Sequence, residues 1–226
     1  MLKNNTTKEV TLAKLVVRNF TMSLDGFTSA PNQSLENPFG EGGKSIMDWA
    51  LATWTFRTMF GIEGGSTGID DTFAAKADEG VGATIMGRNM FGPIRGAWLN
   101  EDWKGWWGAN PPYHHPVFVL TKYPRQSIPM EGGTTFHFVT EGIDIALAKA
   151  FDAANGKDVR IGGGATVVRQ YLRAGLIDEL HLVITPKLLG AGERLFDGTD
   201  EVVKRYEYSE FMASEAAAHV RLVKRK

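Results

Sequence analysis

Apolar and polar positions along the chain predict strands and helices in alternation. Short runs of β-branched and aromatic residues are typical of strands, whereas apolar residues spaced three or four positions apart are typical of amphipathic helices. Because helices separate most of the strands, we expect an α/β fold with a mostly parallel central sheet. The predicted strands are residues 14–22, 83–86, 116–120, 135–139, 158–161 and 179–184, and the predicted helices are residues 46–60, 70–79, 87–91, 143–154 and 166–174.

Three regions depart from this alternation. Residues 202–212 and 217–223 read as two strands with no helix between them, which predicts an antiparallel C-terminal hairpin at one edge of the sheet. Residues 28–45 form a long loop rich in Gly, Pro, Asn and Ser, and such loops are usually functional or mobile. Residues 92–115 form a Trp-rich insertion, which indicates a lid over a ligand, a subunit contact or local self-packing. Its tryptophans are Trp98, Trp103, Trp106 and Trp107.

The composition favours a single domain over residues 1–226. Hydrophobic residues are 43% and charged residues 23% of the chain, which is typical of a globular protein with one core. The net charge of −1 provides no field that would attract nucleic acid or an anionic membrane. Residues 1–13 are expected to be flexible and lack the apolar core of a secretory signal. Since no apolar run is long enough to span a bilayer either, we expect a cytoplasmic protein.

The strongest motif is a run of three glycines between a strand and a helix, within residues 158–172. Gly162, Gly163 and Gly164 let a ligand approach the main chain, and the start of the helix offers unpaired N–H groups and a partial positive charge. This arrangement suits a phosphate, although a plain strand-to-helix turn has the same pattern. The spacing differs from G-x-G-x-x-G, so a Rossmann fold is not indicated.

Two further strands end in residues suited to an anionic ligand. One strand runs through Gly87 into a helix that begins near Arg88, and another is followed by Thr121, Lys122 and Arg125. In open α/β sheets, ligands bind outside the carboxyl ends of the strands. All three clusters fall at such ends.

Taken in this order, the motifs resemble those of the dihydrofolate-reductase-like superfamily over residues 14–223. Within it, the chain looks most similar to the C-terminal reductase domain of the riboflavin-biosynthesis deaminase/reductase and its stand-alone relatives. The resemblance implies a three-layer α/β/α sandwich, a homodimer and a nicotinamide cofactor. It is carried by Met-Ser-Leu-Asp-Gly-Phe at 22–27, Ile-Met-Gly-Arg at 85–88, Val-Leu-Thr at 119–121, Ile-Gly-Gly-Gly-Ala at 161–165, Asp-Glu-Leu-His-Leu at 178–182 and Pro-Lys-Leu-Leu-Gly-Ala-Gly at 186–192.

The resemblance also implies which residues bind the cofactor. The three glycines correspond to the pyrophosphate site, with a cis peptide bond expected between Gly162 and Gly163. Thr121, Lys122 and Arg125 correspond to the site of the adenosine 2′-phosphate, and a hydroxyl with cations suits that dianion, so NADPH is favoured over NADH. The expected cofactor-binding residues are Gly26, Met86, Gly87, Arg88, Thr121, Lys122, Arg125, Ile161, Gly162, Gly163, Gly164, Ala165 and Thr166.

Two carboxylates are candidate catalytic residues. Asp25 resembles the Asp of the family's Ser-Leu-Asp-Gly segment, and Asp48 lies close to the position of the pteridine-binding acid of dihydrofolate reductases. A C=N or C=O substrate needs a proton as well as a hydride, and a carboxylic acid is one source of it. A turn former at Asp25 and a helix N-cap at Asp48 are equally good interpretations.

The expected function is the reduction of a small molecule by NADPH. The substrate class is a pterin- or pyrimidinone-like heterocycle, or a carbonyl or imine compound. The alternative is a dinucleotide-binding or sensing module without turnover. Because the chain has no cysteine, it lacks the zinc deaminase site of the riboflavin enzymes, and we find no clear match to their ribose-phosphate contacts. His114 and His115 are adjacent and point apart, so no metal site is predicted.

Overall fold

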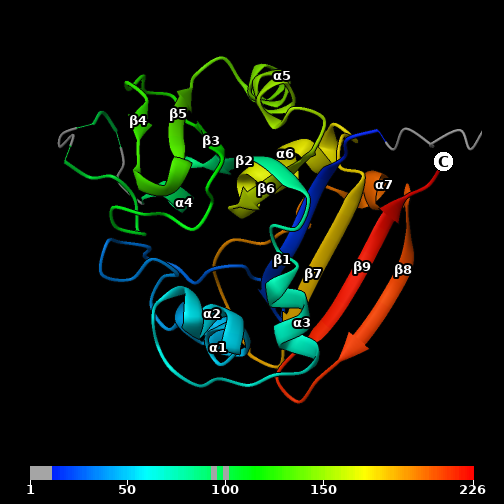
Figure 1. Cartoon of the computed structure of the whole chain (residues 1–226). Coiled ribbons are helices and arrows are strands. Elements are labelled where there is room, and N and C mark those ends of the chain that lie inside the picture. Colours follow the sequence, from blue (N-terminus) through cyan, green and yellow to red (C-terminus); the bar gives the residue numbers. More distant parts are fainter. Residues whose placement is uncertain (1–11, 93–95, 99–101) are drawn as a thin grey trace, which may run out of the picture.

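A nine-stranded sheet runs through the described part of the chain and follows the predicted α/β pattern (Figure 1). The computed structural model describes residues 12–92, 96–98 and 102–226, so most of the N-terminus that we expected to be flexible lies outside these ranges. The strands lie in the order β4-β5-β3-β2-β6-β1-β7-β9-β8. They are β1 Leu15–Ser23, β2 Val81–Gly87, β3 Pro116–Leu120, β4 Ile128–Pro129, β5 Thr135–Val139, β6 Asp158–Gly163, β7 Glu179–Thr185, β8 Tyr206–Ala213 and β9 Ala218–Lys224.

The centre of the sheet is parallel and its edges are antiparallel. The six strands from β5 to β7 in this order are parallel to one another. β8 and β9 form the predicted antiparallel hairpin, and β9 joins it to β7. β4 adds a short antiparallel strand at the other edge. We did not predict β4, because two residues that include Pro129 carry no strand pattern.

Helices cover both faces of the sheet, as the three-layer prediction requires. Neighbouring residues of one strand point to opposite faces. On β7, Leu182 belongs to the core cluster that includes side chains of α5 and α6, whereas Val183 packs with Trp49 and Ala50 of α1. None of the helices in the described ranges is long and apolar enough to cross a membrane. The helices are η1 Gly43–Met47, α1 Asp48–Leu51, α2 Trp54–Met59, α3 Ile69–Ala75, α4 Arg88–Phe91, η2 Glu131–Gly133, α5 Ile143–Ala154, α6 Ala165–Arg173 and α7 Asp200–Val203.

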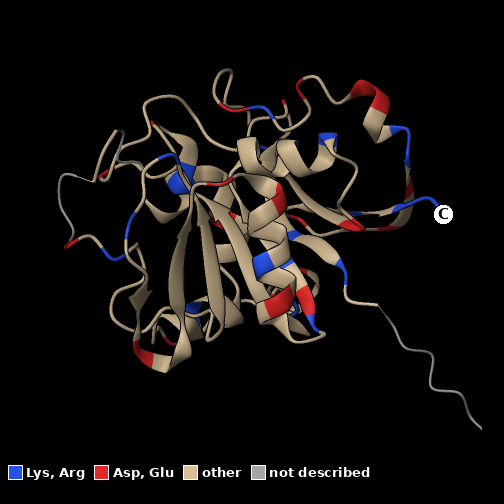
Figure 2. Ribbon diagram, turned by 90° about the horizontal axis from the view of Figure 1, so that it is seen from above, with Lys and Arg blue, Asp and Glu red and all other residues tan. Residues whose placement is uncertain are grey.

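Charged residues lie mainly on loops, strand ends and the outer sides of helices (Figure 2). The strands in the middle of the sheet are almost free of them in this view. This distribution is expected when both faces of a parallel sheet are buried under helices.

The helix predicted over residues 46–60 is divided into η1, α1 and α2. The break lies at Thr53, whose side chain donates to Ala50 O at 2.7 Å and accepts from Phe56 N at 3.2 Å, so that it ends one helix and caps the next. The backbone beside it pairs with Ser66, since Trp54 N donates to Ser66 O at 2.9 Å. This contact with a distant turn replaces the helical hydrogen bonds.

The strand predicted over residues 202–212 was also wrong at its start. Residues 200–203 form α7, in which Val202 N and Val203 N both donate to Thr199 O at 2.9 and 3.0 Å. β8 begins only at Tyr206. The β-branched pair Val202–Val203 is typical of strands but is equally able to bury its side chains in one helical turn.

Candidate functional site

A cavity of about 890 Å³ lies at the carboxyl ends of the central strands. Gly87, Leu120 and Gly163, the last residues of β2, β3 and β6, all line it. Its volume is in the upper part of the range of about 300–1,000 Å³ that is typical of small-molecule sites. The parallel order of these strands places the cavity where ligands bind in open α/β sheets.

The first half of the cavity, which we call the glycine end, is built by the strand-to-helix turn after β6. It consists of residues 162–167 together with Gly87, Arg88, Thr121 and Lys122. A Cβ placed on Gly164 would meet nothing within 4 Å, so the main chain is open to a ligand at this point. The first N–H groups of α6, which have no partner inside the helix, begin directly after it. The cis peptide bond joins Gly163 and Gly164, one residue later than expected.

The opposite wall of the glycine end comes from β2, α4 and β3. A Cβ on Gly87 would approach Val167 Cγ2 to 2.9 Å, so glycine is required for β2 to end against α6. The Arg88 guanidinium stacks on the Trp98 ring, 3.8 Å from its centroid, and donates to Gly96 O. With Lys122 after β3, this wall presents two cations.

Nine of the thirteen predicted cofactor-binding residues line the cavity, and four do not. Met86 and Ile161 are fully buried inside β2 and β6. Gly26 lies in the turn after β1, and the Arg125 guanidinium packs beside the Trp98 ring, 4.9 Å from its centroid. The nine that the fold brings together are Gly87, Arg88, Thr121, Lys122, Gly162, Gly163, Gly164, Ala165 and Thr166.

Neither predicted catalytic carboxylate lines the cavity. Asp25 accepts from Ser23 Oγ at 2.5 Å, and from Gly190 N and Leu189 N at 2.7 and 3.1 Å. These hydrogen bonds, that of Ser23 first, lower the pKa of Asp25 to about 2. Its carboxylate therefore ties the turn after β1 to the loop after β7. Asp48 is the first residue of α1, not its N-cap, and its carboxylate lies 3.0 Å from Lys187 Nζ.

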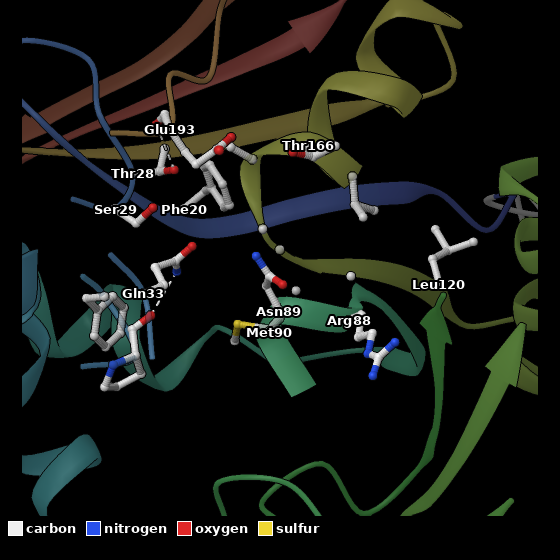
Figure 3. Close-up of a pocket in the computed structure, with 18 of the residues that line it drawn as sticks. Phe20, Thr28, Ser29, Gln33, Arg88, Asn89, Met90, Leu120, Thr166 and Glu193 are labelled. Atoms are coloured by element: carbon white, nitrogen blue, oxygen red, sulfur yellow. Dashed lines mark hydrogen bonds between the residues drawn. The ribbon is translucent and has the colours of Figure 1, made fainter. Parts of the chain in front are cut away.

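The second half of the cavity, which we call the loop end, is built by side chains from distant segments (Figure 3). Figure 3 shows Thr28, Ser29, Gln33 and Glu193 on the opposite side of the cavity from Arg88. These residues lie in loops without a motif, and the sequence did not identify them. The described residues of the loop end are Asn19, Phe20, Thr21, Thr28, Ser29, Gln33, Pro38, Phe39, Ile46, Met47, Phe56, Asn89, Met90, Trp106, Trp107 and Glu193.

Glu193 is the only acidic side chain among the described residues that line the cavity. It follows Gly192, whose φ of 134° and close approach to Ser29 O exclude a side chain. The two loops then pair through Thr28 N to Glu193 O at 2.9 Å and Glu193 N to Ser29 O at 3.1 Å. Arg169 Nη2 lies 3.3 Å from the Glu193 carboxylate. The motif at residues 186–192, which ends one residue before Glu193, was the available signal.

The described residues of the Trp-rich insertion show the predicted local packing, and two of its tryptophans reach the cavity. Its described residues pack locally, since Trp103 Nε1 donates to Phe91 O and Trp98 Nε1 donates to Tyr123 O, both at 3.0 Å. Trp106 and Trp107 also line the cavity. Residues 93–95 and 99–101 of the insertion lie outside the described ranges.

Two buried histidines support the floor of the loop end. β1 carries a bulge at Asn19, whose φ is 54°, and Asn19 N donates to His181 Nδ1 at 3.2 Å. Because that nitrogen accepts, the proton of His181 is on Nε2, which donates to His219 Nδ1 at 3.2 Å. His219 Nε2 then donates to Asp70 at 2.8 Å. The ring of Phe73 stacks on His219.

The fold and cavity define an α/β protein of the dihydrofolate-reductase-like class, with a cavity at the ends of its parallel strands. Residues 14–219 match the family of the RibD C-terminal domain, and the chain belongs to this family. A search of the curated proteins finds no match.

Solved structures show the same fold. A protein assigned to riboflavin biosynthesis in Shewanella sp. PV-4 has a TM-score of 0.56 and 20% identity, over 96% of this chain and 100% of that one. The diaminohydroxyphosphoribosylaminopyrimidine deaminase/5-amino-6-(5-phosphoribosylamino)uracil reductase of Thermotoga maritima has a TM-score of 0.54 and 12% identity, over 94% of this chain. This chain spans 57% of that protein.

Dihydrofolate reductase of Enterococcus faecalis, in complex with NADP(H), has a TM-score of 0.53 and 13% identity, over 96% of this chain and 100% of that one. At these identities the likeness concerns the fold alone. It confirms the dihydrofolate-reductase-like sandwich that the motifs predicted.

Proposed function

We propose that the protein is an NADPH-dependent reductase of a small heterocyclic, carbonyl or imine substrate. The observation that carries the proposal is the glycine end, where an open main-chain turn and a helix start face two cations across one cavity. A dinucleotide needs such a combination, because its phosphates are anionic and must lie close to N–H groups.

The residues present fit the cofactor. Gly163, Gly164 and the start of α6 hold the pyrophosphate, since the space above Gly164 is empty of protein atoms. Arg88 lies along the phosphates from the opposite wall, and Thr121 with Lys122 holds the 2′-phosphate. When bound, the cofactor supplies the hydride, and the protein supplies position and exclusion of water.

The loop end then positions the substrate next to the glycine end. Phe20 and Met90 of the loop end lie on its side toward Arg88, as Figure 3 shows, and keep the reacting region apolar. The Glu193 carboxylate accepts N–H groups of the substrate, and water supplies the proton that a C=N or C=O group takes up. Arg169 fixes the Glu193 carboxylate through its ion pair.

Titration of the purified protein with NADPH and NADH tests the proposal. Trp106 and Trp107 line the cavity, so a bound dihydronicotinamide should quench their fluorescence and accept energy from them. We expect micromolar binding of NADPH and weaker binding of NADH. Absence of binding for both cofactors would overturn the proposed reductase and leave the fold assignment unaffected.

Turnover separates a reductase from a dinucleotide-binding module. Loss of NADPH absorbance with a panel of pterins, pyrimidinones and small imines would support catalysis. Cofactor binding without turnover of any of them would support the module. The homodimer and the cytoplasmic location remain predictions.

A further inference from the structure

We infer that Trp98 positions both cations that the proposed function assigns to the cofactor phosphates, although it does not itself line the cavity. Its indole ring contacts the Arg88 guanidinium, and its indole N–H holds the turn that carries Lys122. The inference rests on the proposed function for the place of the cofactor, and it adds a role for the Trp-rich insertion. Trp98 acts through Arg88 and Lys122, so it is a positioning residue and not a catalytic one.

The first contact is a stack between the indole ring and the Arg88 guanidinium. Arg88 Cζ lies 3.8 Å from the centroid of the Trp98 ring and 5.3 Å from that of the Tyr123 ring. A cation near the face of an aromatic ring is attracted by the electrons of the ring, most strongly for tryptophan. Arg88 also donates to the main-chain oxygen of Gly96, which lines the cavity as Arg88 does. A guanidinium has several N–H groups, so this bond is compatible with a phosphate contact.

The stack makes the binding of an anion at Arg88 less costly. A free arginine side chain adopts many rotamers, and a phosphate that binds it must immobilise it. The ring of Trp98 and the carbonyl of Gly96 already restrict the side chain of Arg88. Figure 3 shows Arg88 on the same side of the cavity as Leu120, the last residue of β3. The guanidinium is therefore held beside the strand end that leads to Lys122.

The second contact holds the turn after β3. Trp98 Nε1 donates to Tyr123 O at 3.0 Å, on the far side of Lys122 from the strand. On the near side, Thr121 N donates to Val139 O at 3.0 Å, and the Thr121 hydroxyl accepts from Tyr123 N at 3.2 Å. The main chain is thus fixed on both sides of Lys122. Loss of the indole N–H should let this turn move, and with it the cation that we assign to the 2′-phosphate.

The indole itself is anchored to the core. Its ring is in edge contact with Phe91 of α4 and Phe138 of β5, with 6.0 and 5.3 Å between ring centroids. Phe91 is fully buried. The Arg125 guanidinium packs beside the same indole, 4.9 Å from the ring centroid. Trp98 therefore provides one fixed surface for two cations that follow different strands.

Calorimetric titration of two variants with NADPH and NADH tests the inference. Trp98→Leu removes the ring face and the N–H group, and we expect it to weaken the binding of NADPH by about tenfold and that of NADH by about threefold. The binding of NADH is weakened less because NADH has no 2′-phosphate for Lys122. Trp98→Phe retains a ring for Arg88 but not the N–H donor, so it should weaken the binding of NADPH by about threefold and leave the binding of NADH nearly unchanged.

Trp103→Phe is the matched control. It also removes an indole N–H from the insertion, but this group donates to Phe91 O instead of Tyr123 O. The ratio of the two cofactor affinities should then remain that of the unchanged protein. A smaller folded fraction lowers the apparent affinity for both cofactors equally, so the ratio also distinguishes positioning from a loss of stability. If either Trp98 variant weakens the binding of NADPH and NADH by the same factor, or leaves both unchanged, the inference is wrong.

Chemical modification tests the inference without the cofactor. If the unchanged protein binds neither NADPH nor NADH, the proposed function fails, and the stack on Arg88 is still measurable with phenylglyoxal, which reacts with guanidinium groups. Arg88 Nε and Nη2 are buried, so modification should be slow. Trp98→Leu should raise the rate at Arg88 several-fold, as read from the masses of the peptides, whereas Trp98→Phe should keep it. The rate at the exposed Arg225 serves as the internal reference in every variant. An unchanged rate at Arg88 in Trp98→Leu would overturn the inference.

Discussion

The two ends of the cavity are built in different ways. The glycine end is mainly main chain, since residues 162–166 form a continuous strand, turn and helix start. The loop end is mainly side chains, which come from β1, the long loop, α1–α2, α4, the Trp-rich insertion and the loop after β7. Main-chain geometry recognises what all dinucleotides share, whereas side chains can be exchanged to suit a particular substrate. A family can thus retain one end and vary the other.

The first prediction has the largest expected effect and concerns the glycine end. Gly164→Asp places a carboxylate in the open space that we assign to the pyrophosphate. We expect the affinity for NADPH to fall by about 100-fold, because like charges in a desolvated site repel strongly. Fluorescence titration measures the change, and calorimetry with 6-methylpterin on the free protein should detect a much smaller effect.

Gly164→Ala is the matched control for this change. The alanine Cβ meets no atom within 4 Å, so the change adds bulk without charge. The affinity of this variant for NADPH should stay within about threefold of that of the unchanged protein. If Gly164→Asp and Gly164→Ala weaken the binding of NADPH equally, the loss of affinity is steric and the pyrophosphate assignment is wrong.

This difference between the two ends explains how much the sequence could predict. The strand, the three glycines and the helix are contiguous, so local pattern marked residues 162–166 of the glycine end. The ends of two other strands, together with the family resemblance, added Gly87, Arg88, Thr121 and Lys122. Gln33 and Glu193 lie in loops, where no periodicity marks a side chain that faces a cavity. Glu193 lies beside Thr28 because Gly192 packs against Ser29, a contact between segments more than 150 residues apart. Such a contact has no local signal.

The other errors of the sequence-based predictions also arise from contacts between segments that are separated in the sequence. The break at Thr53 depends on pairing with Ser66, and the role of Asp25 depends on the N–H groups of Leu189 and Gly190. In each case local propensity was outweighed by a partner that is distant in the sequence. Resemblance identified Asp25 as an important position, but not that its carboxylate is used to connect two turns.

The second prediction concerns the floor of the loop end and its histidines. Burial lowers the pKa of His181 to about 3, and it also lowers that of His219. In the unfolded chain a histidine has a pKa of about 6.5, so below that pH the unfolded state binds protons that the folded state does not. The free energy of unfolding should therefore fall on acidification, by about 2 kcal/mol from His181 alone between about pH 7 and about pH 5. Urea unfolding at the two pH values measures it.

His181→Asn tests the origin of this pH dependence. The Asn oxygen can still accept a hydrogen bond, but the side chain does not titrate, so the loss of stability on acidification should shrink. His114→Asn, at an exposed position, should keep the original pH dependence. A pH dependence that is the same in His181→Asn and the original protein would contradict the assignment.

The third prediction separates NADPH from NADH at the glycine end. Lys122 is exposed after β3, where we place the 2′-phosphate. Lys122→Ala should weaken the binding of NADPH by about fivefold, as expected for a solvent-exposed charge pair, and should leave the binding of NADH nearly unchanged. Lys44→Ala, at an exposed position near the end of the long loop, is the control and should alter the binding of neither cofactor. Equal weakening of both cofactors would show that Lys122 does not contact the 2′-phosphate.

The smallest effect is expected at the loop end, where Trp106 contributes one of several ring surfaces. Trp106→Ala should weaken the binding of 6-methylpterin by about threefold, because a single aromatic contact contributes about 0.5–1.5 kcal/mol. Trp54→Ala, which removes an exposed indole outside the cavity, should change nothing. NADPH affinity should be unaffected in both variants, since Trp106 belongs to the loop end. If Trp106→Ala weakens the binding of NADPH more than the binding of 6-methylpterin, the insertion covers the cofactor. Trp106 would then belong to the glycine end.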